Sequence, residues 1–271
     1  MALVTPCRYV EWMTQSAQVG AQLKSWRERR RLTQLGLSSA AGVSTRHLSF
    51  IETGRSKPSK DMIILLSECL EVPLRQRNTL LLAGGHAPAY SESALAETPM
   101  SAVSDAINRI VDAHDPYPAV VVDHQWDLIV GNRAVSILTE GSAAFLLEPP
   151  VNVLRLSLHP EGMAPRIANL AQWRTHVIAR LRREVEVTAD AQLGALLEEV
   201  RTYPSGGEWH EDETSSLLVP LRIRAGETEL AMFSTTTVFG TPRDVTLAEI
   251  AIECFYPSDR ETAEFFRAKL Q

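Results

Sequence analysis

The stretch LTQLGLSSAAGVSTRHLSFIETGRSKP, residues 32–58, decides how the first part of this chain folds. It begins with Thr33, whose side chain is a good helix N-cap, so residues 34–41 are predicted to form one short helix. Gly42 follows, and glycine turns through positive φ without steric cost. The first half of the stretch therefore predicts a short helix that ends in a tight turn.

The second half of the stretch predicts another helix. Ser44 is its N-cap, residues 45–53 form it, and Gly54 stands where a left-handed residue ends it. Small Ser38 falls where the two helix backbones approach most closely. The apolar positions that pin the pair together are Leu37, Ala41, Val43, Leu48 and Ile51.

The polar face of the second helix has the pattern of a helix that reads the major groove of DNA. Thr45, Arg46, Ser49 and Phe50 share this face by their i, i+3 and i, i+4 spacing. The alternative is an ordinary helical hairpin in which both glycines are turn residues only. Caps, turn, buried positions and basic flanks all agree with DNA binding, so we favour that interpretation.

The stretch resembles the Cro/repressor-like (XRE) helix-turn-helix family, and in particular the MmyB-like regulators. The resemblance rests on Ser38, the turn 42–44, the pair Leu48 and Ile51, and the ending Ile51-Glu52-x-Gly54-x-x-x-Pro58. It implies a partner of double-stranded DNA, with Arg46 reading a base edge and Gln34, Arg55 and Lys57 holding phosphate. The full set expected at the DNA is Thr33, Gln34, Ser44, Thr45, Arg46, Ser49, Phe50, Arg55 and Lys57.

Charge is distributed unevenly along the chain. The net charge of −6 would argue against nucleic acid, but residues 1–90 hold 12 Lys+Arg against 6 Asp+Glu, whereas the remainder holds 15 against 27. A basic first part suits a phosphate backbone, and an acidic remainder would be repelled by it. The two parts are therefore expected to have different partners.

Composition excludes several classes of protein. The chain is 45% hydrophobic and 22% charged, which is ordinary for a globular protein, and it has no apolar run of about 18 residues, so we expect no membrane insertion and a cytoplasmic location. Its three cysteines, Cys7, Cys69 and Cys254, lack CxxC spacing and predict reduced thiols rather than disulfides or zinc ligands.

The predicted domains follow from helical spacing and from one polar linker. Residues 1–14 are an N-terminal arm without periodicity, with Met13 as an alternative start; 15–85 form an all-α five-helix domain; 86–100 are a linker rich in alanine, serine and proline; and 101–271 form the second domain. The other helices expected in the first domain span 20–31, 60–70 and 73–83.

The start of the second domain is similar to that of a PAS-like domain. Residues 101–114 predict an amphipathic helix, 118–123 and 126–130 predict two strands, and Gly131-Asn132-Arg133 leads into a helix. Further strands are expected at 215–223 and 229–238. The predicted fold class is α+β: the five-helix domain, then a PAS-like domain with an antiparallel sheet.

Residues 148–187 resemble the ligand-binding half of the MmyB-like family. The resemblance implies a small, fatty-acid-like effector whose acidic head would need an arginine or amide donors. The prediction anchors this head near Asn132 and Arg155. All candidate ligand contacts are Asn132, Asn152, Arg155, Arg166, Trp173 and His176.

A search for catalytic and metal-binding motifs gives no support for an enzyme. GxSxG, GxxxxGK[ST], GxGxxG after a strand and HExxH are absent, and His210–Glu213 reads better as a solvated loop than as a metal site. We expect a transcription regulator without catalytic residues, metal or cofactor. It would act as a homodimer, because one recognition helix reads only a half-site. The alternatives are an enzyme with an appended helix-turn-helix and an antitoxin-like interaction module.

Overall fold

A computed structural model describes the chain except for residues 1–6, 96, 99, 208–217 and 271, and it describes no side chains for residues 7–17. The chain divides into two compact units, one made of Met1–Glu92 with Arg243–Val245 and the other of Ser93–Pro242 with Thr246–Gln271. No helix among the described residues is both long and apolar enough to cross a membrane.

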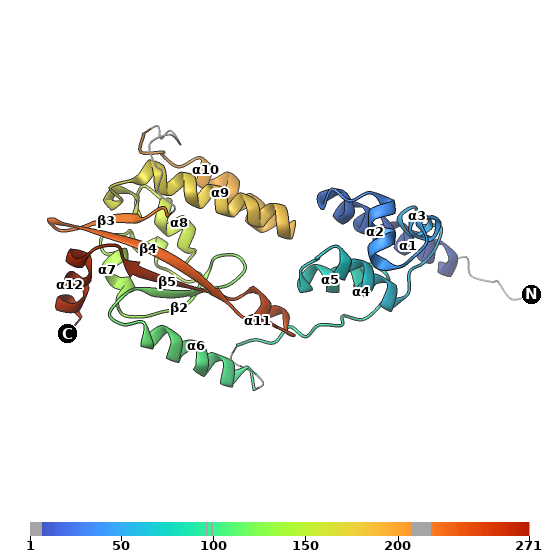
Figure 1. The fold of residues 1–271 in the computed structure, drawn as a ribbon, viewed down its shortest axis with the longest axis horizontal. Coiled ribbons are helices and arrows are strands. Elements are labelled where there is room, and N and C mark those ends of the chain that lie inside the picture. Colours follow the sequence, from blue (N-terminus) through green and yellow to red (C-terminus); the bar gives the residue numbers. More distant parts are fainter. Residues whose placement is uncertain (1–6, 96, 99, 208–217, 271) are drawn as a thin grey trace, which may run out of the picture. The chain divides into compact units, whose positions relative to one another are not determined.

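Helices build the N-terminal unit (Figure 1). Thr33 and Ser44 accept hydrogen bonds from backbone N–H groups in the first turns that follow them, as predicted for N-caps, and Ser59 does the same for α4. Gly42 and Gly54 have φ of 65° and 72°, so both helix ends use the left-handed conformation that glycine permits. The helices are α1 (Cys7–Arg29), α2 (Gln34–Ala41), α3 (Thr45–Glu52), α4 (Lys60–Cys69) and α5 (Leu74–Ala83).

The first helix is longer than the sequence predicts. It runs from Cys7 to Arg29, where the pattern predicts a helix over 20–31 and an unstructured arm over 1–14. Residues 7–14 are therefore helical, and the rest of the predicted arm, residues 1–6, lies outside the described residues. At Gly20 the helix lies against α3 so closely that an added Cβ would stand 2.2 Å from the carbonyl oxygen of Ile51. Only glycine fits this contact.

The core of the N-terminal unit unites all of its helices. The predicted positions Leu37, Leu48 and Ile51 are fully buried, and Trp26 is buried beside them. Burial of large apolar side chains is the main stabilising contribution in such a small unit. The other fully or nearly fully buried members are Val19, Leu23, Ile63, Leu66, Leu70, Val72, Leu80 and Leu81.

The first residues of the predicted linker pack on α5. The Asn78 side-chain oxygen accepts hydrogen bonds from the backbone N–H groups of Ala89 and Tyr90, at 3.0 and 3.1 Å, and its amide nitrogen donates to the Tyr90 carbonyl at 2.8 Å. Arg77 stacks on the Tyr90 ring, with 5.7 Å from its guanidinium carbon to the ring centre. The predicted linker is therefore fixed at its start.

An antiparallel five-stranded sheet forms the centre of the C-terminal unit. Its strands are β1 (Ala119–Val122), β2 (Leu128–Gly131), β3 (Leu221–Ala225), β4 (Thr228–Val238) and β5 (Ala251–Pro257). The order is β2-β1-β5-β4-β3, so the two strands of the first hairpin lie on one side of the last strand and those of the second hairpin on the other. The predicted hairpins are present, although residues 215–217 of the predicted third strand lie outside the described residues.

Helices cover both faces of the sheet (Figure 1). On one face α6 packs through Ile107 and Val111 against Val121 and Ile252. On the other face, Leu154, Leu181 and Leu197 belong to a larger apolar cluster with Val120 and Met232. The helices of this unit are α6 (Ser101–Ala113), α7 (Val135–Thr139), α8 (Val153–Leu158), α9 (Leu170–Thr188), α10 (Ala191–Arg201), α11 (Val245–Glu249) and α12 (Arg260–Lys269), with 3-10 turns η1 (Ala144–Leu146) and η2 (Ala164–Arg166).

The segments beside the edge strands also pair with them. Ile167, just after η2, forms an antiparallel bridge with Ile223 of β3, and Asp127, next to β2, forms one with Asn152. Within α6, Ile107 and Val111 are buried, whereas the side chain of Ile110 is 42% exposed. The predicted fold class, α+β with an all-helical first domain and an antiparallel sheet in the second, is confirmed.

Candidate DNA-binding face and ligand cavity

The exposed face of α3 carries the residues that the sequence places at DNA. Thr45 and Arg46 are exposed, while Ser49 and Phe50 are half-buried. The Arg46 guanidinium carbon lies 5.4 Å from the centre of the Phe50 ring, a cation–π distance that extends the arginine along the helix. The Thr45 hydroxyl lies 2.9 Å from that of Ser38, so α3 is joined to α2 at its first turn. These contacts hold the face in one orientation.

The loop after α3 places the two other predicted phosphate contacts. The Ser56 N–H donates to the Phe50 carbonyl at 3.0 Å and ties the loop to the helix. Arg55 is exposed and Lys57 is half-buried. The backbone that carries both cations is thus held near the C-terminal end of α3.

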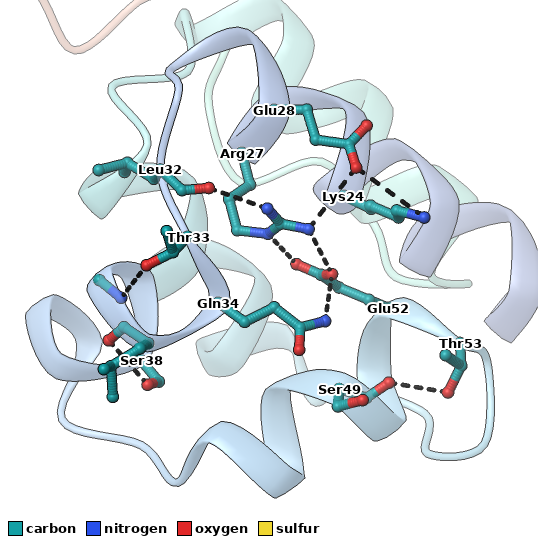
Figure 2. Close-up of polar contacts among 12 residues, drawn as sticks. Lys24, Arg27, Glu28, Leu32, Thr33, Gln34, Ser38, Ser49, Glu52 and Thr53 are labelled. Atoms are coloured by element: carbon teal, nitrogen blue, oxygen red, sulfur yellow. Dashed lines mark hydrogen bonds and ion pairs between the residues drawn. The ribbon is translucent and has the colours of Figure 1, made fainter.

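A buried ion pair lies behind α3 (Figure 2), and the sequence analysis did not predict it. Arg27 Nε and Nη2 donate to the two carboxylate oxygens of Glu52 at 2.7 and 2.9 Å, and Gln34 Nε2 donates to Glu52 Oε2 at 2.8 Å. Arg27 also donates to the carbonyl of Leu32 at 2.8 Å. The exposed fractions of Arg27 and Glu52 are 8% and 5%. The cluster therefore joins α1, α2 and α3.

The charges in this cluster stabilise one another. Burial raises the pKa of Glu52, but hydrogen bonds from Arg27 and Gln34 and the charge of Arg27 outweigh it and leave the pKa below its ordinary value. The hydrogen bond to Glu52 raises the pKa of Arg27. Both groups are ionised at neutral pH.

Three predicted polar residues of the first unit also have partners within the protein. Gln34, expected at phosphate, is bonded to Glu52, and Thr33 Oγ1 accepts from the Gly36 N–H at 3.0 Å. Ser44, the N-cap of α3, likewise accepts from the N–H of His47 at 3.2 Å. Within the basic segment at the end of α1, Arg30 donates to the carbonyls of Leu70 and Glu71, both at 2.9 Å, and so is held by the end of α4.

In the C-terminal unit, a cavity of about 100 Å³ lies between the inner face of the sheet and helices α7, α8 and α9. Most of its wall is apolar, as in ordinary small-molecule sites. The apolar lining consists of Val120, Trp126, Val135, Leu138, Val153, Leu154, Leu156, Met163, Trp173, Val177, Leu221 and Phe255. The polar lining consists of Thr139, Ser157, His176, Arg180, Ser234 and Glu253.

A charged cluster forms the polar end of this cavity. Arg180 Nη2 donates to Glu253 Oε1 at 2.5 Å and to Thr236 Oγ1 at 3.0 Å, and the Thr236 hydroxyl donates to the same Glu253 oxygen at 2.7 Å. Arg180 Nε lies 3.4 Å from Glu184 Oε1, and Trp126 Nε1 donates to Glu184 Oε2 at 2.7 Å. Burial raises the pKa of Glu184 although Trp126 and Arg180 oppose this. The Arg180 guanidinium thus contacts the carboxylates of both Glu253 and Glu184.

Two of the six predicted ligand contacts, Trp173 and His176, line the cavity. The Trp173 Nε1–H donates to Ser157 Oγ at 2.9 Å, and its ring stacks on that of His176 at 5.7 Å between centres. Burial, and then the charges of Arg180 and Arg183, lower the pKa of His176. The imidazole is therefore neutral at pH 7 and brings no positive charge to the cavity.

The two asparagines of the ligand prediction lie away from this cavity and bind the protein itself. The Asn132 side-chain oxygen accepts from the Ala119 N–H at 3.1 Å, and its nitrogen donates to the Tyr117 carbonyl at 2.7 Å. Asn152 is the N-cap of α8 and donates to the Gln125 carbonyl at 2.7 Å. Both side chains are buried.

The two arginines of the ligand prediction also have protein partners. Arg155 forms two bonds with the carboxylate of Glu199 on α10, at 2.6 and 2.8 Å, and the Tyr203 hydroxyl donates to the same carboxylate at 2.5 Å. Arg166 donates to the carbonyls of residues 137, 138 and 140 at the end of α7, and to that of Arg224 at 2.9 Å. A pocket of about 270 Å³ is lined by Asn152 and Arg155, but the Arg155 guanidinium that was expected to bind the acidic head contacts the Glu199 carboxylate instead.

The sequence search did not single out Arg180 or Glu253 as cavity residues. Arg180 lies on α9 and Glu253 on β5, two elements that are far apart in the sequence and meet only in the folded unit. No local sequence motif identifies either residue. Among the described residues, no group of three potential metal-ligating side chains converges. The stretch His210–Glu213 lies outside the described residues.

Comparison with known proteins assigns both units. The family model described as "MmyB-like transcription regulator ligand binding domain" matches residues 103–268. The chain belongs to the MmyB-like transcription regulator family. A second model, "Helix-turn-helix", matches residues 23–76. This MmyB-like protein is thus a DNA-binding transcription regulator that combines a helix-turn-helix unit with a ligand-binding domain.

Solved structures resemble it only distantly. The clp gene regulator ClgR from Corynebacterium glutamicum is 20% identical with a TM-score of 0.24, and the match covers 38% of this chain and 95% of that one. An RNA-binding light-oxygen-voltage receptor is 14% identical with a TM-score of 0.27, over 100% of this chain and 70% of that one. Scores this low add nothing to the fold assignment. No curated protein matches the chain.

Proposed function

We propose that this MmyB-like regulator binds an operator through α3 and that a small, elongated, largely apolar effector in the cavity of the C-terminal unit changes its affinity for that operator. The single observation that carries the proposal is the apolar cavity between the sheet and α7 to α9. A cytoplasmic location follows from the DNA partner.

The α3 face supports sequence-specific binding. Arg46 is exposed and oriented by Phe50, which suits a bidentate contact to guanine in the major groove. Arg55 and Lys57 suit phosphate, because they flank the helix on a short loop. For Gln34 we propose a double role, in which Glu52 holds the amide nitrogen while the rest of the side chain positions the start of α2 at phosphate.

The DNA part of the proposal is tested by selecting genomic fragments on full-length protein and sequencing them. Arg46→Ala should lose preference at one base pair, with an affinity loss of about 1–3 kcal/mol, whereas Lys57→Ala should weaken all sequences alike. Arg267→Ala, which removes an exposed arginine from α12, is the matched control and should behave as wild type. If Arg46→Ala left both operator affinity and base preference unchanged, the proposal that this face of α3 contacts the bases would be wrong.

The size of the cavity sets a limit on the effector. Ligand pockets ordinarily measure roughly 300–1,000 Å³, so the cavity of about 100 Å³ admits only a short chain as it stands. A longer fatty-acid-like body would have to displace wall residues such as Met163, a flexible side chain suited to repacking. Trp173 and His176 are the two predicted ligand residues that we retain as cavity contacts. We assign Asn132, Asn152, Arg155 and Arg166 structural roles.

We also propose a homodimer formed through residues beyond 100. A single recognition helix reads only half of a palindromic operator, and a second subunit supplies the other half. Exposed apolar side chains of the C-terminal unit, among them Ile110 on α6 and Ile129 on β2, are 42% and 39% exposed and are available for an interface. Equilibrium sedimentation of the full chain tests this, and a monomer at micromolar concentration contradicts it.

A further inference from the structure

The polar end of the cavity has the wrong charge for an acidic ligand. Its only guanidinium among the lining residues, that of Arg180, already contacts the carboxylates of Glu253 and Glu184. A carboxylate entering the cavity would meet the carboxylate of Glu253 and one arginine that already contacts both Glu253 and Glu184. The neighbouring His176 is neutral, because burial and the adjacent arginines lower its pKa.

Glu253 has an oxygen available for a ligand. Its side chain lies on β5 in the middle of the sheet, lines the cavity and is 4% exposed. Oε1 accepts from both Arg180 and Thr236, whereas Oε2 has no hydrogen-bond donor among the described residues. Oε2 is not fully enclosed by protein atoms and can accept a hydrogen bond, so this position favours a guest that donates one.

The remaining wall fits the same kind of guest. Ser234 stands two residues from Thr236 on the same strand face, and its hydroxyl both donates and accepts. The apolar side chains of Leu156 and Val177 and the ring of Trp173 surround the rest of the space. A short hydrocarbon with one polar end matches this division.

We propose that the cavity binds an alkyl molecule whose polar end is a hydrogen-bond donor, a primary amine or alcohol, seated on Glu253 Oε2, and that it discriminates against the carboxylate of the same chain length. This inference rests on the proposed effector cavity and specifies its ligand. It departs from the acidic head that the sequence predicts near Asn132 and Arg155.

The test compares hexan-1-amine, hexan-1-ol and sodium hexanoate on the full-length protein at pH 7 by isothermal titration calorimetry. Each of the three has six carbons, of which hexanoate carries one in its carboxylate, so they differ mainly at the head and the comparison on unaltered protein needs no variant. The amine or the alcohol should bind at least ten-fold more tightly than hexanoate. If the amine alone binds, the guest is cationic, and if both bind, neutral donors suffice.

Variants then locate the site. Glu253→Gln keeps one acceptor oxygen but removes the charge, so it should weaken the amine at least ten-fold and the alcohol less. Glu229→Gln is the matched control, because it removes an exposed carboxylate of β4 and should leave all affinities unchanged. Leu156→Trp should fill the cavity and abolish binding of every compound.

The outcomes separate this inference from the proposed function. If hexanoate binds as tightly as the amine and the alcohol, and Leu156→Trp abolishes binding of all three, the head-group inference is wrong but the cavity is still an effector site. Binding that ignores Leu156→Trp places the compounds elsewhere and overturns the inference. No binding by any compound overturns both the inference and the cavity as an effector site for short chains.

Discussion

Removal of the Arg27 guanidinium tests how far the buried pair with Glu52 stabilises the N-terminal unit. Arg27→Met keeps an apolar stem of similar length but leaves a 5%-exposed carboxylate with Gln34 as its remaining donor in the cluster. Breaking a buried pair in this way costs about 3–5 kcal/mol, a large part of the roughly 5–15 kcal/mol by which ordinary domains are stable. With a urea m-value of about 1–3 kcal/mol/M, the unfolding midpoint should fall by at least about 1 M.

The assay is urea unfolding of the fragment 18–92, in which Trp26 is the only tryptophan and a buried reporter. The fragment contains all the members of the N-terminal core. The double variant Arg27→Met, Glu52→Leu should recover most of the loss, because it leaves no unpaired buried charge. Glu28→Gln, which alters a 58%-exposed carboxylate 3.8 Å from Arg27, should cost less than about 1 kcal/mol. An Arg27→Met fragment within about 1 kcal/mol of wild type, or a double variant no better than the single one, would refute the reasoning.

Three further expectations concern DNA, assembly and pH. Arg46→Lys should lose base preference almost as fully as Arg46→Ala while keeping more of the affinity, because lysine keeps the charge but lacks the bidentate fork; a selection from random DNA decides this. Sedimentation of fragments 18–92 and 93–271 should find the first monomeric and the second dimeric, and the reverse result would contradict the assembly. The Arg155 pair lowers the pKa of Glu199 to about 2 from its ordinary 4.5, so its stabilisation is present above pH 4.5 and is lost as pH falls toward 2. Glu199→Gln should flatten this part of the melting profile, although the exposure of both side chains keeps the effect small, and an unchanged slope would argue against the pair.

Local signals in the sequence were sufficient to place the two helices of the helix-turn-helix, α2 and α3. The caps Thr33 and Ser44 and the turn residue Gly42 act within a few residues of themselves, so the sequence alone places α2 and α3 correctly. The pairing of Arg27 with Glu52 spans 25 residues and has no local signature. It appears only when α1 and α3 are packed together.

The ligand cavity was less accessible to sequence reasoning for the same reason. Arg155 stands in an apolar segment and was expected to anchor an acidic head, but its partner Glu199 follows 44 residues later on α10. Glu253 lies in a strand whose neighbours are apolar, and its partner Arg180 is 73 residues away. The sequence shows that a charged residue in an apolar segment is unusual. Whether its side chain pairs with another residue or lines a cavity depends on the fold.

The bridges beside the edge strands have a consequence for solubility during folding. A free sheet edge offers unpaired N–H and C=O groups to other chains and promotes aggregation. Ile167 covers part of the β3 edge, where the Ala168 N–H also donates to the Arg222 carbonyl at 2.7 Å, and Asn152 and Val151 meet the chain at the start of β2. Both coverings come from the segment between the two hairpins. Chains in which this segment has not yet docked therefore expose both edges at once, and that interval is when the regulator is most prone to self-association.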